Sequence, residues 1–292
     1  MKSFLSLVII MAASVSLLSQ THSRDDSEPN NGILLVTFGT SIPRAQEAFW
    51  HIEEKVRQAF PETEIRWAYT SNIIRNKLRS QGTSIDSPAE ALAKMGAEGF
   101  THVAVQSLHM IPGEEFENLA RTVWAFYHIP KGLQEVRLGT PLLTTHEDNL
   151  RMSRFIEKEF GSLTGKHEAL VFMGHGTHHH ANIHYPAFQY YLNRQNDRIF
   201  LGTVEGFPEL EDVFPVLEEE GIKEITLLPF MTVAGDHAIN DMAGEEEDSW
   251  KSQLESKGYI VQPILKGLAE YEEVVDIWID HLKCAVEELY EE

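Results

Sequence analysis

Gly32-Ile-Leu-Leu-Val-Thr-Phe-Gly-Thr40 recurs later in the chain as Ala169-Leu-Val-Phe-Met-Gly-His-Gly-Thr177. Both stretches are apolar runs that end in Gly-Thr, and His175 of the second stands where Phe38 stands in the first. An internal repeat of this kind predicts two similar βα domains. Because open α/β sheets bind ligands at the ends of their strands, the loops that leave the repeated strands should meet in one cleft.

A second pair of apolar runs strengthens the repeat. Gly99 and Gly113 flank the first run, Gly221 and Gly235 flank the second, and the spacing is the same in both. Two residues beyond the closing glycines stand Glu115 and His237. The repeat therefore places side chains that handle protons or metals at matching positions of the two halves.

Apolar strands alternate with amphipathic helices along the chain, which predicts a parallel sheet in each half. We expect an α/β fold with two pseudo-symmetric domains, residues 32–145 and residues 146–292, facing a central cleft. The predicted strands are 32–38, 64–69, 102–108, 136–141, 168–174, 199–204, 223–229 and 259–264. The predicted helices are 44–59, one that starts at Ser87-Pro-Ala-Glu90, 115–126, 147–160, 184–193, 209–220, one that runs from the loop 230–237 to about 256, and a long terminal helix.

The first residues do not belong to this repeat. Lys2 is followed by an apolar run from Phe4 to Leu18 and then by small and polar residues, which is typical of a signal peptide at residues 1–23. Residues 24–31 are charged and turn-forming, which predicts a tether between the signal peptide and the first strand. We therefore expect a periplasmic protein that has no membrane contact once the signal is removed; an uncleaved membrane anchor is the alternative.

Composition limits the partners. The formal charge of −21 argues against nucleic acid and anionic membranes. The one cysteine, Cys284, cannot form an internal disulfide, and its helical surroundings predict a buried small hydrophobic residue. Roughly 270 mature residues are enough to build a core without disulfides.

Three strand ends of the second half present His175, Glu205 and His237. Two imidazoles and a carboxylate suit a divalent first-row metal and leave coordination positions open. Asp236 and Asp241 lie close enough to His237 to orient its ring. Two alternatives to metal binding stay open. Glu205 could form an ion pair with Arg194 or Arg198, and His237 could be a surface residue.

Glu115 occupies in the first half the position that His237 has in the second. A carboxylate that faces a metal across a cleft can accept protons or hold an incoming cation. Glu114 and Glu117 are its rivals, although helical geometry should direct them to other faces. The run His178-His-His180 could collect metal transiently, but we expect adjacent histidines on a loop to point in different directions.

At these residues the sequence resembles the sirohydrochlorin cobaltochelatases of anaerobic cobalamin synthesis. The motifs that carry the likeness are 36–41, 106–109, 113–115, 171–176, 204–205 and 233–242. The family has the type II chelatase fold. The resemblance implies that Co²⁺, or else Fe²⁺, is inserted into the tetrapyrrole sirohydrochlorin with release of two protons. It maps the metal ligands onto His175, Glu205 and His237, the proton acceptor onto His175, and an assisting role onto Glu115. It also implies a homo-oligomer.

Two other functions stay open at this point. One is an exported, non-catalytic protein that binds metal or haem through the same histidines, and the other is a protoporphyrin ferrochelatase. The basic residues that could meet substrate carboxylates are Arg44, Arg75, Lys77 and Arg79. The spare histidines that could bind haem are His51, His102, His109, His128 and His146.

Overall fold

The computed structural model describes residues 29–130 and 132–291. The predicted signal peptide and most of the predicted tether lie outside this part. Two four-stranded parallel sheets with the same strand order make up the fold, β2-β1-β3-β4 and β6-β5-β7-β8. Their bounds are β1 Asn31–Thr37, β2 Glu64–Tyr69, β3 His102–Ser107, β4 Glu135–Gly139, β5 Glu168–Gly174, β6 Ile199–Thr203, β7 Glu224–Phe230 and β8 Ile260–Pro263. The predicted parallel α/β fold is confirmed.

Helices cover both faces of each sheet, as continuous apolar strands require. After the first residue, every residue of β1 and β5 is buried. The helices are α1 Pro43–Ala59, α2 Asn72–Ser80, α3 Pro88–Ala97, α4 Glu114–Ala125, α5 His146–Phe160, α6 His184–Asn193, α7 Leu210–Glu219, α8 Trp250–Ser256 and α9 Glu272–Glu288. Short helical turns lie at Gly161–Leu163, His180–Ile183, Ala238–Met242 and Leu268–Glu270.

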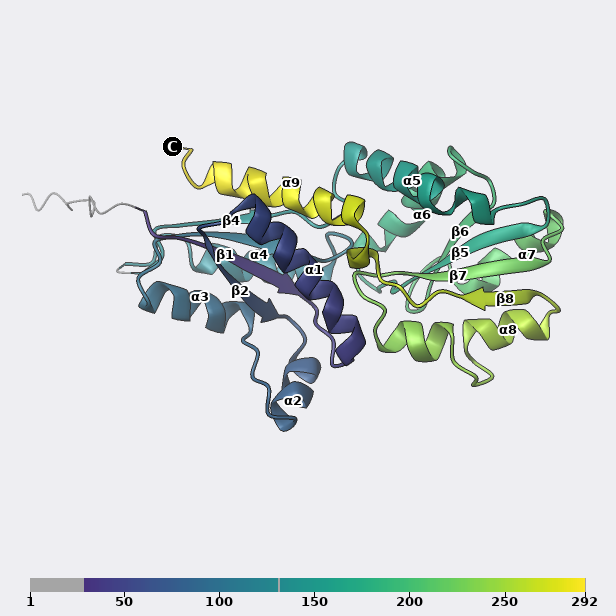
Figure 1. Cartoon of the computed structure of the whole chain (residues 1–292), viewed down its shortest axis with the longest axis horizontal. Helices are drawn as coiled ribbons and strands as arrows, with labels where there is room; N and C mark the ends of the chain where they lie inside the picture. Colours follow the sequence, from purple (N-terminus) through teal and green to yellow (C-terminus); the bar gives the residue numbers. More distant parts are fainter. Residues whose placement is uncertain (1–28, 131, 292) are drawn as a thin grey trace, which may run out of the picture.

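The two sheets lie end to end, and their carboxyl ends meet at the middle of the molecule (Figure 1). The Thr232 hydroxyl, just after β7, donates a hydrogen bond to the Leu108 carbonyl just after β3, at 2.8 Å. Gly235 follows in the same loop, and a Cβ added there would lie 3.6 Å from Thr40 Oγ1 in the loop after β1. The loop after β7 therefore faces the loops after β3 and β1, and the two halves meet at the ends of their strands as the repeat predicts.

The C-terminal helix ties the halves together. The chain returns from the second sheet, and α9 packs against β3, β4 and α1 of the first sheet (Figure 1). One apolar core cluster includes Ile33 of β1, Phe172 of β5 and Trp278 of α9. The two domains consequently share a continuous core. Among the described residues, no helix combines the length and apolar character that a membrane span requires.

Three sequence-based predictions need correction. Cys284 is exposed, because about 200° of helix rotation separates it from the buried Leu282. Helix α2 is an additional element that the predicted order lacked. The predicted continuous helix up to residue 256 is instead a π-helical turn and the separate helix α8. The acidic run Glu245–Asp248 separates the two, and Ser249 caps α8 by accepting from the Ser252 N–H.

Candidate metal centre

His175, Glu205 and His237 come together at the carboxyl ends of β5, β6 and β7. One ligand atom from each lies within 4.8 Å of the others. His175 Nδ1 is 3.9 Å from Glu205 Oε2, and the rings of His175 and His237 meet edge to face with centroids 4.7 Å apart. The three side chains chosen from the sequence thus form one cluster.

Both imidazoles are oriented by an acceptor at Nδ1. His175 Nδ1 lies 3.0 Å from the Gly176 carbonyl, and His237 Nδ1 lies 2.5 Å from Asp241 Oδ2. Because a carbonyl and a carboxylate can only accept, each Nδ1 carries the proton and Nε2 keeps its lone pair. Nε2 of each ring therefore keeps a lone pair that a cation can use, and Asp241, one of the two aspartates considered for this role, orients His237.

Glycines let the loops after β5 and β6 approach closely. Gly176 has φ of 77°, and an added Cβ would lie 2.6 Å from the Gly206 nitrogen. Asn182 joins the same loops, since its Oδ1 accepts from the Thr177 N–H and its Nδ2 donates to the Phe207 carbonyl. This close approach holds the Glu205 backbone N–H 2.8 Å from the His175 carbonyl. This backbone contact fixes the position of Glu205 beside His175.

Tyr185 supports the His175 loop from behind. Its ring fills the space beside Gly174, where an added Cβ would lie 2.6 Å from a ring carbon. Burial raises the pKa of Tyr185 to about 12. The phenol therefore stays protonated at neutral pH and acts as a packing group rather than a proton acceptor.

The cluster is open to solvent. The side chains of His175, Glu205 and His237 are 41%, 52% and 34% exposed. Beside it lies an open hollow of about 720 Å³ lined by the loops after β5 and β6, including Glu205 and Phe207, a volume within the range of ligand pockets. A cation held by these three side chains would keep positions open for water or for a second ligand.

The alternative partners of Glu205 are engaged elsewhere. Arg198 lies 3.9 Å from Glu220 and donates to the Lys166 carbonyl, while Arg194 lies near the Tyr190 hydroxyl. Of the predicted substrate-binding cations, Arg75 is paired with Glu90 at 3.3 Å. No ion pair of Arg44 or Lys77 is found within the described part of the chain.

Glu115 lies in the first turn of α4, partly buried, and is not one of the three clustered residues. Its rival Glu117 is the α4 carboxylate that contacts the second domain, through His179 and His180. The expectation that adjacent histidines of the 178–180 run point apart is wrong for these two. Sequence spacing missed this because α4 and the loop after β5 are brought together only by the docking of the domains.

Several spare histidines have structural partners. His102 stacks on Tyr290 with centroids 5.7 Å apart, and His146 Nδ1 lies 2.9 Å from the Tyr191 hydroxyl. His109 lies in the loop after β3, where burial lowers its pKa to about 4. The contacts with Tyr290 and Tyr191 give His102 and His146 a structural role.

The two α/β domains, each with a four-stranded parallel sheet, have the type II chelatase fold. The solved structure of the sirohydrochlorin chelatase SirB from Bacillus subtilis subspecies spizizenii, in complex with cobalt, has a TM-score of 0.54 and 13% identity. The match covers 88% of this chain and 96% of that one. At this level of identity the likeness concerns the fold.

The sequence likeness is more specific. The chain belongs to the cobalt chelatase (CbiK) family, whose profile matches residues 31–287. It is 41% identical to the sirohydrochlorin cobaltochelatase CbiKC of Nitratidesulfovibrio vulgaris, covering 88% of this chain and 91% of that protein. It is 36% identical to the sirohydrochlorin cobaltochelatase of Salmonella typhimurium, covering 89% and 98%.

Proposed function

We propose that the chain inserts Co²⁺ into sirohydrochlorin and releases two protons. The observation that carries this proposal is the open cluster of His175, Glu205 and His237 at the carboxyl ends of β5, β6 and β7. A protein that only carries a metal binds it most tightly when protein side chains fill every coordination position. A chelatase must instead release the metal to the tetrapyrrole. A cation held by only three side chains, each partly exposed, keeps open positions through which it can pass to the tetrapyrrole. The activity named for both relatives supports the same substrate pair.

The ligand set suits the substrate metal. Imidazole and carboxylate ligands bind Co²⁺ more tightly than Fe²⁺ in the usual order of divalent metals. We therefore propose Co²⁺ as the preferred substrate and Fe²⁺ as a slower one. The Nδ1 contacts with Gly176 and Asp241 hold both rings ready, so that little reorganisation is needed when the cation arrives.

Insertion requires bases for two pyrrole protons. When the cation moves from the protein to the macrocycle, Nε2 of His175 regains a free lone pair and can accept the first proton. We assign the second to a carboxylate of the first domain, with Glu115 as the candidate, because α4 begins at the loop that follows β3. In this scheme His175 serves both as metal ligand and as base.

We also propose that the chain acts after export. The family profile begins at residue 31, so that the apolar run from Phe4 to Leu18 precedes the matched region. This layout supports a removable leader that precedes the matched region. Fractionation of cells that express the full chain tests it: the proposal expects a shortened protein in the periplasm, and a full-length protein in the cytoplasm would refute it.

The activity is tested by following the visible spectrum of sirohydrochlorin mixed with Co²⁺ and the purified protein under anaerobic conditions. The proposal expects insertion much faster than in the protein-free mixture. A parallel assay with protoporphyrin and Fe²⁺ should show no such acceleration. Equal rates with and without protein, while metal still binds, would favour a non-catalytic binding protein. Acceleration with protoporphyrin alone would favour a ferrochelatase.

A further inference from the structure

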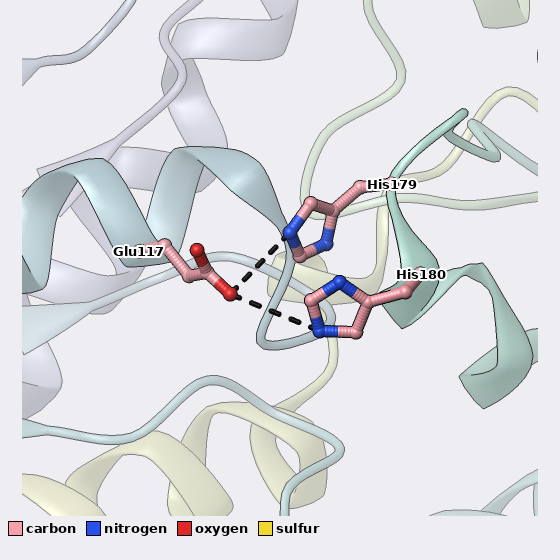
Figure 2. Close-up of side chains that lie close together, drawn as sticks. All are labelled: Glu117, His179 and His180. Carbon is pink, nitrogen blue, oxygen red and sulfur yellow. Dashed lines mark ion pairs between the residues drawn. The ribbon is translucent and has the colours of Figure 1, made fainter.

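A second cluster of metal-binding side chains lies outside the proposed active site, where Glu117 faces His179 and His180 (Figure 2). We propose that these three residues form a second divalent-cation site that receives the substrate metal before it passes to His175, Glu205 and His237. The identity of the cation as Co²⁺ rests on the proposed function; the existence of the site does not.

The geometry suits one cation. Glu117 Oε1 lies 3.3 Å from His179 Nε2 and 3.9 Å from His180 Nε2. The two imidazoles lie side by side with centroids 3.9 Å apart. A single ligand atom from each residue lies within 4.8 Å of the other two. Small side-chain movements would bring all three to the distance of about 2.0–2.2 Å at which nitrogen and oxygen ligands hold a first-row cation.

The cluster joins the two domains. Glu117 belongs to α4 of the first domain, whereas His179 and His180 belong to the loop between β5 and α6 of the second. The side chains converge from facing elements (Figure 2). Neither histidine takes part in the cluster at His175. A cation bound here would bridge the domains at one side of the proposed active site.

Solvent reaches this cluster easily. The His180 side chain is 81% exposed, while His179 is only 16% exposed. A hydrated cation can therefore meet His180 first and exchange water for the inner histidine afterwards. The formal charge of −21 raises the local concentration of cations around the whole protein. The arrangement favours capture from solution.

The hydrogen bonds around His179 indicate that this site is the weaker of the two. The Ala181 N–H donates to His179 Nδ1 at 3.3 Å, which leaves the ring proton on Nε2, facing Glu117. A cation at Nε2 must displace that proton and disturb the Ala181 contact. At His175 and His237, by contrast, Nε2 is already free. Arg121, 3.4 Å from the other Glu117 oxygen, adds an opposing positive charge.

Weaker binding at Glu117, His179 and His180 and stronger binding at His175, Glu205 and His237 favour transfer of the cation from the first cluster to the second. His175 and His179 are four residues apart in one loop, so their backbones are separated by at most about 14 Å. The exposed loop that starts at Thr177 also lines the open hollow beside Glu205. A released cation would therefore travel a short path along a surface that carries ligands at both ends.

Equilibrium dialysis with Co²⁺ alone, without tetrapyrrole, tests the site. The wild type should bind two ions per chain, one at least tenfold more weakly than the other. Glu117→Gln and His179→Gln should each lose the weaker ion and keep the tighter one, and Arg121→Gln should strengthen the weaker site. His178→Gln, which alters the neighbouring histidine outside the cluster, should keep both. One ion in the wild type, or two in both cluster variants, would overturn the proposal.

Kinetic measurements test separately whether this second site delivers Co²⁺ to the proposed active site. In the sirohydrochlorin assay, Glu117→Gln should raise the KM for Co²⁺ at least threefold and leave kcat at saturating Co²⁺ unchanged. An unchanged KM would refute delivery. A wild type that binds two ions but inserts none would refute the proposed function and leave the second site standing. Thermal unfolding of each variant shows whether its fold is intact.

Discussion

His237 donates its Nδ1 proton to the Asp241 carboxylate four residues further along the chain, at 2.5 Å. The π-helical turn Ala238–Met242 brings the two side chains together. Since the carboxylate fixes which ring nitrogen carries the proton, the irregular turn has a chemical consequence. It gives His237 one orientation before any cation arrives.

Replacement of this carboxylate should weaken metal binding. Asp241→Asn should lower the Co²⁺ affinity of the tighter site by about 10–100-fold, because an amide orients and polarises the ring less well. Calorimetric titration with Co²⁺ measures the change. Asp236→Asn, which removes a neighbouring carboxylate that does not hydrogen-bond to His237 in the described part of the chain, is the matched control and should bind normally. Equal affinities of both variants would contradict the assigned role.

Gly176→Ala should damage both stability and activity. Its φ of 77° costs a non-glycine residue about 1–2 kcal/mol, and the new Cβ would also collide with the Gly206 nitrogen. Gly221→Ala is the control, since Gly221 has φ of 64° and nothing within 4 Å of an added Cβ. Chemical denaturation and the insertion assay should show a larger loss for Gly176→Ala. Similar losses would mean that the close approach of the loops is unimportant.

His109 should make the protein sensitive to acid. Burial lowers its pKa to about 4 in the folded chain, whereas an unfolded histidine has a pKa near 6.5. Between these values the unfolded state binds the extra proton, so stability is complete above about pH 6.5 and falls toward pH 4, by about 3 kcal/mol.

Denaturation curves from pH 8 to pH 4 measure this loss. His109→Gln should flatten the dependence between pH 6.5 and 4, while the difference from the wild type at pH 8 reports packing alone. An unchanged slope in the variant would show that another group controls the acid sensitivity.

Asp148 should be an important link between α5 and α9. Burial alone would raise its pKa, but hydrogen bonds from His281 and Thr145 hold the pKa at about 2. Its contribution is therefore complete above about pH 4 and is lost toward pH 2. Asp148→Asn should destabilise the fold by about 2–3 kcal/mol, since charged hydrogen bonds are lost. Thermal unfolding should show little change for Glu147→Gln, its exposed neighbour.

The repeat made the fold predictable. Gly39 and Gly176 both adopt positive φ at the ends of β1 and β5, so the same local chemistry produces the same turn twice. Parallel strands then bring their carboxyl ends to one edge, which is why the sequence alone predicts that His175, Glu205 and His237 lie together. Periodicity also located most helices.

What sequence could not supply depended on contacts between distant elements. The pairing of Glu117 with His179 requires the docked domains, and α9 returns to the first sheet although it follows the second in the chain. The π-helical turn before Gly244 interrupted a segment whose apolar spacing resembled one helix. The exposure of Cys284 follows from helix phase, which short apolar patterns fix poorly.

The most direct measurement of the central claim is the initial rate of Co²⁺ insertion into sirohydrochlorin by the wild type and by His175→Ala, Glu205→Gln and His237→Ala. The account predicts fast insertion by the wild type, with a loss of at least a hundredfold in His175→Ala and His237→Ala and a smaller loss in Glu205→Gln. Near wild-type rates in His175→Ala and His237→Ala would contradict it, because insertion would then proceed without the cluster at the meeting point of the two sheets.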